Sequence, residues 1–268
     1  MNPPLDTPSP PVLRSDAGGI ATLTLNRPQQ FNALDGAMLD ALGAALDAVA
    51  ADATVRVVVL AGAGRAFCPG HDLKELLAHR EEAFVGDLFA RCGALMQSIQ
   101  GMPQPVIARV HGIATAAGCQ LVAACDLAVA AADARFATSG INFGLFCATP
   151  AVPLSRNVAR KRAFEMLFTG DFIDAPTALA WGLVNRVVAP AELEPATLAL
   201  AQRILEKPRE VVAGGKALFY RQLEAPVASA YAMATRQITE GMLAEAAAEG
   251  VAAFVEKRRP NWRNSGSA

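Results

Sequence analysis

The sequence predicts an α/β protein that ends in an all-helical region. Strand-like and helix-like patterns alternate from about residue 20 to residue 190, and after Leu193 only helix-like patterns remain. Of the 268 residues, 53% are hydrophobic and 18% are charged, which is enough apolar material for a large buried core. We expect a flexible, proline-rich N-terminus over residues 1–16, an α/β core over residues 17–195 and a helical region over residues 196–268.

The first elements follow from alternation and from capping. Residues 20–26 alternate β-branched and apolar side chains, which predicts a strand that Pro28 ends. Asp35 is a typical helix N-cap, and the apolar residues after it recur at the three- and four-residue spacing of an amphipathic helix. Residues 55–61, VRVVVLA, predict a buried strand that is followed by glycines.

The next segment is predicted to hold a loop, two helices and a strand. Residues 65–71 form the loop and lead into a helix that Asp72 caps. Asp72 and Glu75 have the spacing of a capping box, in which each side chain binds the other residue's backbone N–H. A second helix is predicted over residues 84–99; two prolines end it, and a strand follows over residues 106–111.

The remaining elements of the core are shorter. Small residues over positions 112–118 open a helix. Short strands are predicted over residues 127–131, 136–138 and 183–188, and helices over residues 159–168 and after Asp174. The segment with Pro150 and Pro153 is predicted as a loop, and the C-terminal helices are predicted to break near Pro208 and Pro226.

Charge argues against a primary nucleic-acid role, and hydropathy argues against a membrane-spanning segment. The formal net charge is -1, so the chain lacks the basic field that holds a nucleic-acid backbone. Polar and charged residues interrupt the longest apolar region, residues 106–136, which excludes a membrane-spanning helix there. The first residues lack both the hydrophobic stretch of a signal peptide and an arginine-rich transit pattern, so we expect a cytoplasmic protein.

Five cysteines are spread irregularly along the chain, at positions 68, 92, 119, 125 and 147. Their number is odd and no CxxC pair occurs, so neither a disulfide framework nor a structural zinc site is predicted. We expect most of them to be small buried hydrophobic residues in a reducing compartment, and we expect no bound metal.

Two glycine-containing loops, residues 66–71 and 112–118, each follow a predicted strand and lead into a helix. Free backbone N–H groups at the start of a helix attract negative charge, and two such groups that converge on one point would form an oxyanion hole. Ordinary tight connections between strand and helix explain the same spacing, and the residues alone leave both interpretations open. Neither loop matches the fingerprint of a dinucleotide-binding loop or of a P-loop.

Several motifs occur in an order that resembles the crotonase, or enoyl-CoA hydratase/isomerase, superfamily. They are NRP and NAL within residues 26–34, GAGRAFCPGHDLKEL, PVIARVHGIATAAGCQLVAACD, FTGDFIDAPTALAWGLVNRVV and the terminal GVAAFVEKRRPNW. Together they cover about residues 18–262. Within the superfamily, the runs GHDLKEL, AAGCQLVA, INFGLFCATP and RKRAFEMLFTGD are most similar to the enoyl-CoA hydratase domain-containing protein 3 group.

The resemblance implies a fold, an assembly and a substrate class. The implied fold is a spiral of ββα units with a C-terminal helical region that builds a homotrimer or a dimer of trimers. The implied substrates are acyl-CoA thioesters, as in fatty acid metabolism, so coenzyme A enters as part of the substrate and no separate cofactor is expected. The acyl-CoA site would belong to residues 17–195 and the oligomerisation contacts to residues 196–268.

The resemblance also assigns site residues. The two oxyanion-hole donors of the family correspond to the backbone N–H groups of His71 and Ala117. Phe254 and Lys257 correspond to positions that reach a coenzyme A bound to the neighbouring subunit, where Lys257 either pairs with a phosphate or is the solvated end of a helix. The substrate-binding residues implied in this way are Ala66, Cys68, His71, Asp72, Leu73, Lys74, Ala117, Phe254 and Lys257.

The chain departs from the family at both catalytic glutamates, where it has Gln120 and Gly140. A glutamine amide has no proton equilibrium near neutral pH and glycine has no side chain, so neither residue can act as a general acid or base. Each such group typically contributes about 10²- to 10⁴-fold to the rate, so we expect an acyl-CoA site without efficient hydration. Gln120 can still hold a water or the thioester by hydrogen bonds.

His71 is the first candidate to replace the missing glutamates. Its imidazole starts beside the thioester carbonyl, because its own backbone N–H is an implied donor, and its intrinsic pKa suits proton transfer. The alternative is that the ring packs outward or contacts coenzyme A. Structural or exposed roles fit the other titratable or nucleophilic candidates better; these are His79, His111, Asp72, Cys68, Cys147 and Ser139.

Three functions from different classes follow. The first is an acyl-CoA enzyme that stabilises an oxyanion, either a hydratase-like lyase or isomerase or a catalyst of decarboxylation or thioester hydrolysis. The second is a non-catalytic protein that binds acyl-CoA or regulates an enzyme partner, which the loss of both glutamates favours. The third is RNA binding, known for some proteins of this superfamily, and the net charge of -1 argues against it.

Overall fold

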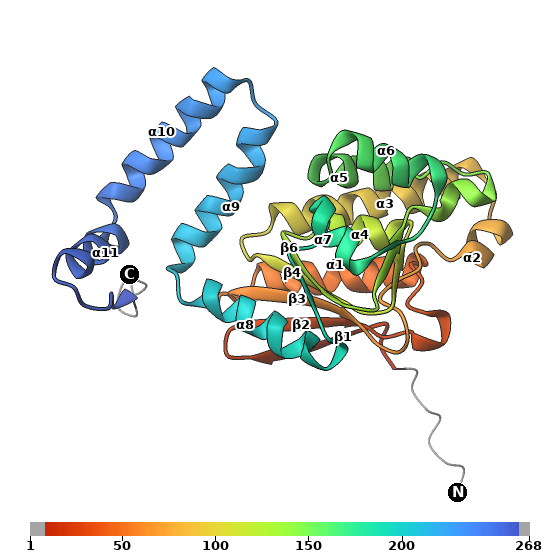
Figure 1. The fold of residues 1–268 in the computed structure, drawn as a ribbon, viewed down its shortest axis with the longest axis horizontal. Helices are drawn as coiled ribbons and strands as arrows, with labels where there is room; N and C mark the ends of the chain where they lie inside the picture. Colours follow the sequence, from red (N-terminus) through yellow and green to blue (C-terminus); the bar gives the residue numbers. More distant parts are fainter. Residues whose placement is uncertain (1–8, 263–268) are drawn as a thin grey trace, which may run out of the picture.

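The computed structural model describes residues 9–262 and contains two sheets surrounded by helices (Figure 1). The larger sheet has the strand order β1-β2-β3-β4-β6-β9, in which all neighbours except β1 and β2 are parallel. The smaller sheet has the order β5-β7-β8, with β5 and β7 parallel. The strands are β1 Val12–Ala17, β2 Ile20–Leu25, β3 Val57–Gly62, β4 Val106–Val110, β5 Ile113–Thr115, β6 Leu127–Ala131, β7 Arg135–Ala137, β8 Ile173–Asp174 and β9 Arg186–Val188.

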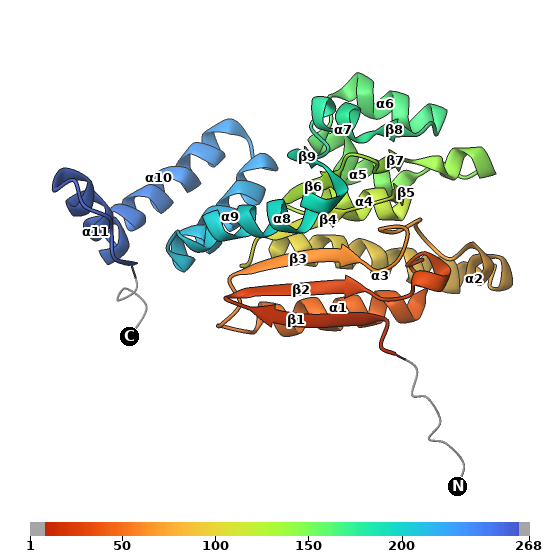
Figure 2. The same cartoon turned by 60° about the horizontal axis from the view of Figure 1, so that its bottom comes forward.

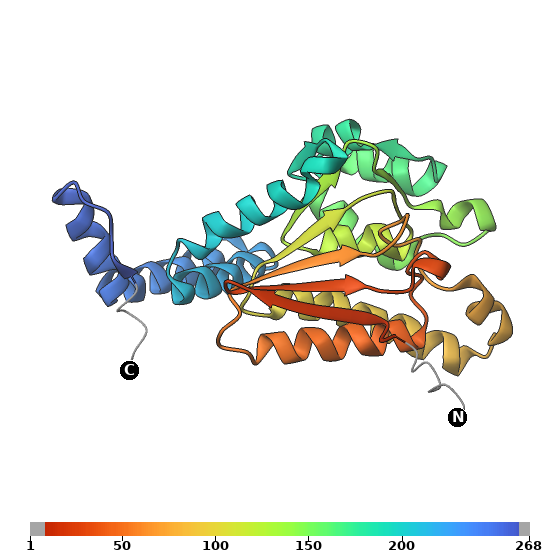
Figure 3. The ribbon, with the colours of Figure 1, turned by 90° about the horizontal axis from the view of Figure 1, so that it is seen from below.

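Helices cover both faces of the larger sheet (Figure 3). The helices α1 and α3 lie on one face, and α8 lies on the other, where its Leu193 and Ala201 pack against the strands. Because both faces are covered, the central strands are apolar throughout, as residues 57–61 illustrate. The α-helices are α1 Gly36–Ala50, α2 Leu73–Ala78, α3 Glu82–Gly101, α4 Ala117–Ala124, α5 Ala148–Asn157, α6 Arg160–Thr169, α7 Ala175–Trp181, α8 Leu193–Leu205, α9 Arg209–Leu223, α10 Val227–Leu243 and α11 Glu245–Val255, and the 3-10 helices are η1 Pro28–Gln30, η2 Ser139–Phe143 and η3 Pro190–Glu192.

Most elements predicted from periodicity and capping are confirmed. The predicted strands over residues 20–26 and 55–61 correspond to β2 and β3, within two residues at each end. The side chain of Asp35 accepts a hydrogen bond from the backbone N–H of Met38 at 2.8 Å and so caps α1. Asp174 caps α7 in the same way. Alternating strand and helix signals therefore gave the right class for the core.

The predicted flexible N-terminus is wrong for its second half. Residues 12–17 form β1, which pairs antiparallel with β2 along its whole length. Gly18 and Gly19 have positive φ angles of 58° and 84° and make the tight turn between the two strands, a conformation that glycine adopts at little cost. Residues 1–8 of the predicted segment lie outside the described residues.

Two other segments also differ from their prediction as loops. The strand β5 lies within residues 112–118 because it pairs parallel with β7. The local sequence pattern does not predict this pairing. α5 replaces the loop predicted around Pro150 and Pro153. It begins at Ala148, so Pro150 falls in the first turn, where backbone N–H groups have no helical acceptor, and Pro153 removes a single interior bond.

The helices α9, α10 and α11 extend away from the α/β core (Figures 1 and 2). α9 is tied to the core by Lys216, whose Nζ lies 2.7 Å from a carboxylate oxygen of Asp126. The same ammonium donates to the backbone carbonyls of Ile99 and Gln104 at 2.7 and 2.9 Å. The Tyr220 hydroxyl donates to the second carboxylate oxygen of Asp126 at 2.8 Å. This buried network fixes the start of the helical extension.

The helices α10 and α11 leave a row of apolar side chains uncovered in the single chain. They are Val227, Tyr231, Ile238, Met242, Leu243, Val251, Phe254 and Val255. Large exposed apolar surfaces of this kind mark interaction sites. Within residues 9–262, no helix combines the length and the apolar character needed to cross a membrane.

All five cysteines are buried and unpaired, which confirms that they act as small hydrophobic residues. Across the part of the chain that the structure describes, no group of three or more His, Cys, Asp or Glu side chains is placed to hold a metal ion.

Candidate active site

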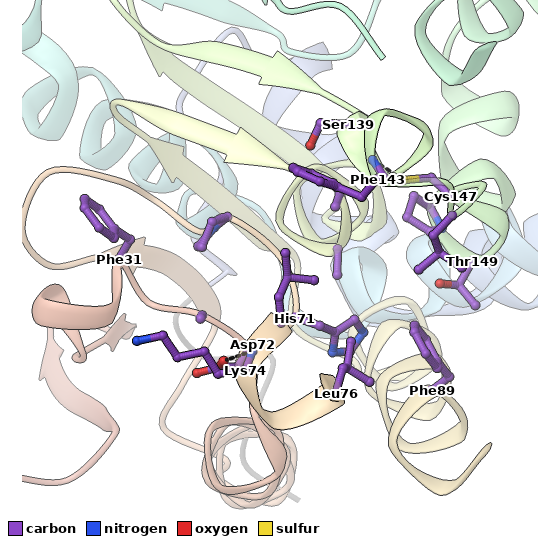
Figure 4. A pocket seen from close by; sticks show the side chains of 18 of the residues that line it. Phe31, His71, Asp72, Lys74, Leu76, Phe89, Ser139, Phe143, Cys147 and Thr149 are labelled. Carbon is purple, nitrogen blue, oxygen red and sulfur yellow. Dashed lines mark hydrogen bonds between the residues drawn. The ribbon is translucent and has the colours of Figure 1, made fainter. Parts of the chain in front are cut away.

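A cavity of about 790 Å³ opens between the loop after β3, helix α3 and the segment from η2 to α5 (Figure 4). This volume is typical of a site for a small molecule. Among the described residues, the acidic and basic groups on its wall are Asp72, Lys74 and His71, and most of the other lining side chains are apolar. Those that dominate the wall are Phe31, Leu73, Leu76, Phe89, Phe143, Leu145, Phe146, Cys147 and Pro150.

The loop that follows β3 is held by the side chain of Asn32. Its amide nitrogen lies 2.9, 2.8 and 3.2 Å from the carbonyl oxygens of Ala63, Ala66 and Phe67. Its Oδ1 accepts from the backbone N–H of Arg27 at 2.9 Å. Asn32 is fully buried and has a φ of 66°, a left-handed conformation that asparagine tolerates better than most residues. This side chain therefore sets the path of the loop toward the cavity.

Two isolated parallel bridges continue the same loop. Cys68 pairs with a residue of β5, and His71 pairs with Leu34. In the second bridge, the N–H of Leu34 donates to the carbonyl of Gly70 at 2.8 Å, and the N–H of Asp72 donates to the carbonyl of Leu34 at 3.3 Å. The backbone N–H of His71 lies between these bonds and faces away from Leu34. It has no acceptor among the described residues.

The second loop brings the start of α4 beside the first. Gly70 has a φ of 101°, and a Cβ there would lie 2.9 Å from the Cβ of Ala116 and 3.1 Å from the backbone nitrogen of Ala117. Only glycine permits so close an approach in this conformation. Ala117 is the first residue of α4, so its N–H has no helical acceptor. The free N–H groups of His71 and Ala117 therefore lie on touching loops, and both residues line the cavity.

Asp72 caps α2, but the predicted capping box is wrong. The carboxylate of Asp72 accepts from the backbone N–H groups of Lys74 and Glu75 at 2.8 and 3.3 Å. The Glu75 carboxylate does not return this bond; its two oxygens lie 3.2 Å from the backbone nitrogen of Gly36. Gly36 is the first residue of α1 and supplies an unpaired donor next to α2, so Glu75 joins the two helices.

The ring of His71 has one bonded and one unbonded nitrogen. Its Nδ1 lies 3.1 Å from the carbonyl oxygen of Leu34, so we assign the ring proton to Nδ1. Its Nε2 is buried and has no hydrogen-bond partner among the described residues. The ring of Phe89 packs edge-on against the imidazole, with 4.8 Å between centroids. Burial lowers the pKa of His71 below its ordinary value, against the opposing effect of the bond to Leu34, so the neutral form predominates at pH 7.

Position 140 has no room for a side chain. A Cβ on Gly140 would lie 2.6 Å from the carbonyl oxygen of Leu145 and 2.8 Å from the sulfur of Cys147. The backbone N–H of Gly140 donates to the same sulfur at 3.3 Å. Cys147 and its neighbours therefore fill the space where a glutamate at this position would begin.

Gln120 is placed differently from Gly140. It lies on α4 and is buried, and its Oε1 has no hydrogen-bond partner among the described residues. The cavity wall does not include it. Gln120 therefore has space for its side chain but lies behind the surface that a ligand would touch.

The structure brings together only part of the residue set implied by the resemblance. His71, Asp72, Leu73, Lys74, Ala117 and Gly140 line the cavity.

Ala66 and Cys68 do not line the cavity, because their side chains are buried in the core. Burial raises the pKa of the Cys68 thiol to about 12, which also excludes a thiolate there. Phe254 on α11 is 85% exposed, and neither it nor Lys257 lines the cavity within one chain. Figure 1 shows α11 far from α2, whose first residues line the cavity.

Sequence reasoning missed the aromatic wall of the cavity. Phe31 follows η1, Phe89 lies on α3, and Phe143 and Phe146 flank the turn between η2 and α5. Phe31, Phe89 and the pair of Phe143 and Phe146 are distant from one another in sequence, so only the fold brings them together. The one available signal was the run INFGLF, in which two aromatic side chains flank a glycine and remain exposed in the folded chain.

Two curated relatives match almost the whole chain. The mouse enoyl-CoA hydratase domain-containing protein 3, mitochondrial, is 42% identical over 261 residues, covering 97% of this chain and 87% of the relative. The Xenopus laevis protein of the same name is 44% identical over 247 residues, covering 92% and 84%. The mitochondrial designation of these relatives contradicts the predicted cytoplasmic location. Buried free cysteines indicate a reducing compartment, but they do not distinguish one such compartment from another.

Two solved structures have the same fold over almost the whole chain. An enoyl-CoA hydratase of Mycobacterium smegmatis is 59% identical with a TM-score of 0.94, covering 96% of this chain and 100% of that one. The human enoyl-CoA hydratase domain-containing protein 3 is 42% identical with a TM-score of 0.91, covering 94% and 100%. The sequence pattern of the enoyl-CoA hydratase/isomerase family matches residues 15–265. With its paired glycine-bearing loops beside one cavity and these matches over nearly its full length, the chain belongs to the enoyl-CoA hydratase/isomerase family.

Proposed function

We propose that the chain binds acyl-CoA thioesters in the cavity and stabilises an oxyanion formed on the thioester carbonyl. The backbone N–H groups of His71 and Ala117 are the two donors. One observation carries the proposal: these groups lack acceptors among the described residues and lie on loops that touch at Gly70. Two preorganised N–H donors aimed at one point stabilise negative charge as it develops on an acyl oxygen.

The cavity wall supports an uncharged, apolar acyl group. Phe89, Phe143 and Phe146 contribute aromatic surface, and Asp72 is engaged as the cap of α2. Lys74 is the basic side chain beside it and is suited to an anionic part of coenzyme A. The proposed chemistry needs no cofactor other than the coenzyme A that the substrate carries.

Efficient hydration is not part of the proposal. Addition of water across a conjugated thioester needs one group to activate the water and another to protonate the carbon. Gln120 cannot transfer a proton, and the contacts of Gly140 with Leu145 and Cys147 leave no space for a carboxylate. Stabilisation of an oxyanion, by contrast, depends on backbone donors that survive a change of side chain.

A non-catalytic acyl-CoA-binding protein is the second candidate. The filled space at Gly140 favours this candidate. The surrounding backbone and the sulfur of Cys147 leave no room for a side chain at this position, so substitution of the glycine alone would not create a second proton-transfer group. Both candidates predict binding, and they differ in whether any bond of the bound acyl group changes.

Calorimetric titration with butyryl-CoA tests the shared part of both candidates. The matched variants are Gly70→Ala and Gly86→Ala. A Cβ at Gly70 would push apart the loops that carry the two donors, whereas a Cβ at Gly86 on α3 meets nothing within 4 Å. We expect binding by the unmodified chain and by Gly86→Ala, and weaker binding by about tenfold or more in Gly70→Ala, which corresponds to about 1.4 kcal/mol. Absence of binding, or equal binding by all three proteins, contradicts the proposal.

We also propose that three copies assemble through the helical region of residues 196–268. The uncovered apolar side chains of α10 and α11 support this assembly, and Phe254 and Lys257 at the end of α11 would then approach a neighbouring cavity. Light scattering coupled to gel filtration should give three or six times the chain mass of 28.0 kDa. A monomer at micromolar concentration contradicts the proposal.

A further inference from the structure

We propose, resting on the function proposed above, that the acyl group of the substrate is a long, unbranched chain whose far end lies on a row of three phenylalanines outside the cavity. This aromatic row consists of Phe146, Phe168 and Phe164. The inference narrows the substrate class from acyl-CoA thioesters in general to those with long acyl chains.

The two ends of the cavity differ in charge. Figure 4 shows Phe31 and Lys74 on one side of His71, and Phe89 and Cys147 on the other. The ammonium of Lys74 suits the phosphates of coenzyme A at the Phe31 end. The side chains labelled at the Phe89 end are uncharged. An acyl group whose carbonyl lies beside His71 would therefore extend toward the Phe89 end.

The aromatic row continues the cavity wall onto α6. Phe146 lines the cavity, and its ring centroid lies 5.2 Å from that of Phe168. Phe168 in turn stacks on Phe164, with 3.8 Å between centroids and 9° between ring planes. An apolar chain that leaves the cavity past Phe146 would therefore meet a further apolar surface on α6.

The fold of α6 does not need these rings for its packing. The inner face of the helix is formed by Ala163, Met166 and Leu167, which are buried in the core. Phe164 and Phe168 are one helical turn apart and about half exposed, on the opposite face. Contiguous apolar surface that remains in water marks a binding site.

The size of the exposed surface suits an acyl chain better than a second protein. Together with its neighbours Phe143 and Leu145, the aromatic row comprises five side chains that are between 41% and 71% exposed. At about 100 Å² for each, they offer about 500 Å², whereas a stable protein interface buries about 800 Å² on each partner. The row also starts at a residue of the cavity wall, so a molecule in the cavity can reach it directly.

The test is calorimetric titration with butyryl-CoA and with dodecanoyl-CoA below its micelle concentration. The variants are Phe164→Ala and Phe168→Ala, which remove one ring of the row each and leave the cavity wall intact. Phe172→Ala is the matched control. Phe172 is also partly exposed, but its ring packs against the guanidinium of Arg135 and does not line the cavity.

We expect the unmodified chain and Phe172→Ala to bind dodecanoyl-CoA about 30-fold or more tightly than butyryl-CoA. A fully buried methylene strengthens binding by about fourfold, so burial of three of the eight additional methylenes suffices for this ratio. Phe164→Ala and Phe168→Ala should each lose about fivefold or more in affinity for dodecanoyl-CoA. Their affinity for butyryl-CoA should stay within about twofold, because a short acyl group ends before the row.

Equal affinities of the unmodified chain for the two ligands overturn the inference, and so does an unchanged preference for dodecanoyl-CoA in a folded variant of the row. If one variant fails to fold, the other decides. Light scattering on the same proteins identifies the competing occupant: a changed molecular mass with an unchanged preference would assign the row to a contact between copies of the chain. These outcomes leave the proposed function standing, whereas absence of butyryl-CoA binding removes the proposed function itself.

Discussion

Gln120 and Gly140, which the resemblance aligns with the two catalytic glutamates of the family, differ in the space that the structure leaves for a side chain. At position 120 the side chain has space, but its oxygen is buried without a partner. At position 140 the backbone lies against Leu145 and Cys147, so no side chain fits. A carboxylate is therefore conceivable at one position and sterically excluded at the other.

Restoring the carboxylate at position 120 should not restore hydration. In Gln120→Glu the second proton-transfer site is still missing, and the new carboxyl sits in a buried environment that favours its neutral form. We expect hydration of crotonyl-CoA, followed by the absorbance of its conjugated thioester, to stay within about tenfold of the unmodified chain. A gain of about 10²-fold or more contradicts the argument that two groups are required.

The loop that follows β3 should be disturbed by the loss of the Asn32 side chain, which holds three of its carbonyl groups. Asn32→Ala removes the donor shared by the carbonyls of Ala63, Ala66 and Phe67, and unsatisfied buried groups cost about 1–3 kcal/mol each. We expect a loss of about 2–4 kcal/mol in the free energy of unfolding, measured by urea titration, together with weaker butyryl-CoA binding.

The matched control for Asn32→Ala is Gln97→Ala, whose exposed amide bonds only to a carbonyl of its own helix. This variant should change the unfolding free energy by less than about 0.5 kcal/mol. Equal stability of the Asn32 and Gln97 variants would show that the loop does not depend on the asparagine.

At the scale of elements, α9 is held by charge as well as by apolar packing. Lys216 is buried together with Asp126, and each has hydrogen-bond partners besides the other. Desolvation lowers the pKa of Lys216 and Asp126 opposes that effect. Burying a charge without its partner is costly, so the network should behave as a unit.

Lys216→Met should therefore destabilise the chain by about 3 kcal/mol, the lower end of the range for a broken buried ion pair. The lower end applies because Asp126 keeps the Tyr220 hydroxyl and the backbone N–H of Val106. Adding Asp126→Asn should recover part of the loss, since no unpaired charge remains. Lys161→Met at an exposed position of α6 is the control, and thermal unfolding is the measurement. Equal melting temperatures of the two single lysine variants contradict the argument.

The sequence predicts well those helices and strands that depend on residues close together in the chain. Periodicity and capping predict β2, β3, α1 and α7, since side-chain spacing and cap residues act within one element. What it misses depends on partners distant in sequence. β5 exists because of β7, and Glu75 caps α1 instead of its own helix because α1 lies beside it. The same limit applies to the candidate site. The resemblance implied His71 and Ala117, which line the cavity, whereas the aromatic residues of the wall come together only in the fold.

At the scale of the whole molecule, the five buried thiols link stability to pH. Burial raises the pKa of Cys68 and Cys119 to about 12 and of Cys92 to about 11, and it also raises those of Cys125 and Cys147. An unfolded chain would ionise these thiols near pH 9, whereas the folded chain keeps them protonated. The folded state therefore binds more protons than the unfolded state above that pH. This contribution to stability is complete below about pH 9 and is lost as the pH rises toward the folded-state values.

The free energy of unfolding should thus fall above about pH 9, by about 1.4 kcal/mol per pH unit for each fully effective thiol. The lowered pKa of Lys216 makes the free energy of unfolding rise with pH up to the ordinary lysine pKa, but this is one group against five thiols. The raised pKa of Tyr220 adds to the fall in the free energy of unfolding above about pH 10. Urea titrations between about pH 7.5 and about pH 10, with a reductant present, measure the slope. Cys92→Ala should make it shallower by one thiol's share, because that variant has one fewer group to ionise on unfolding. A flat profile in the unmodified chain, or an unchanged slope in Cys92→Ala, would mean that the buried thiols ionise in the folded state as readily as in the unfolded one.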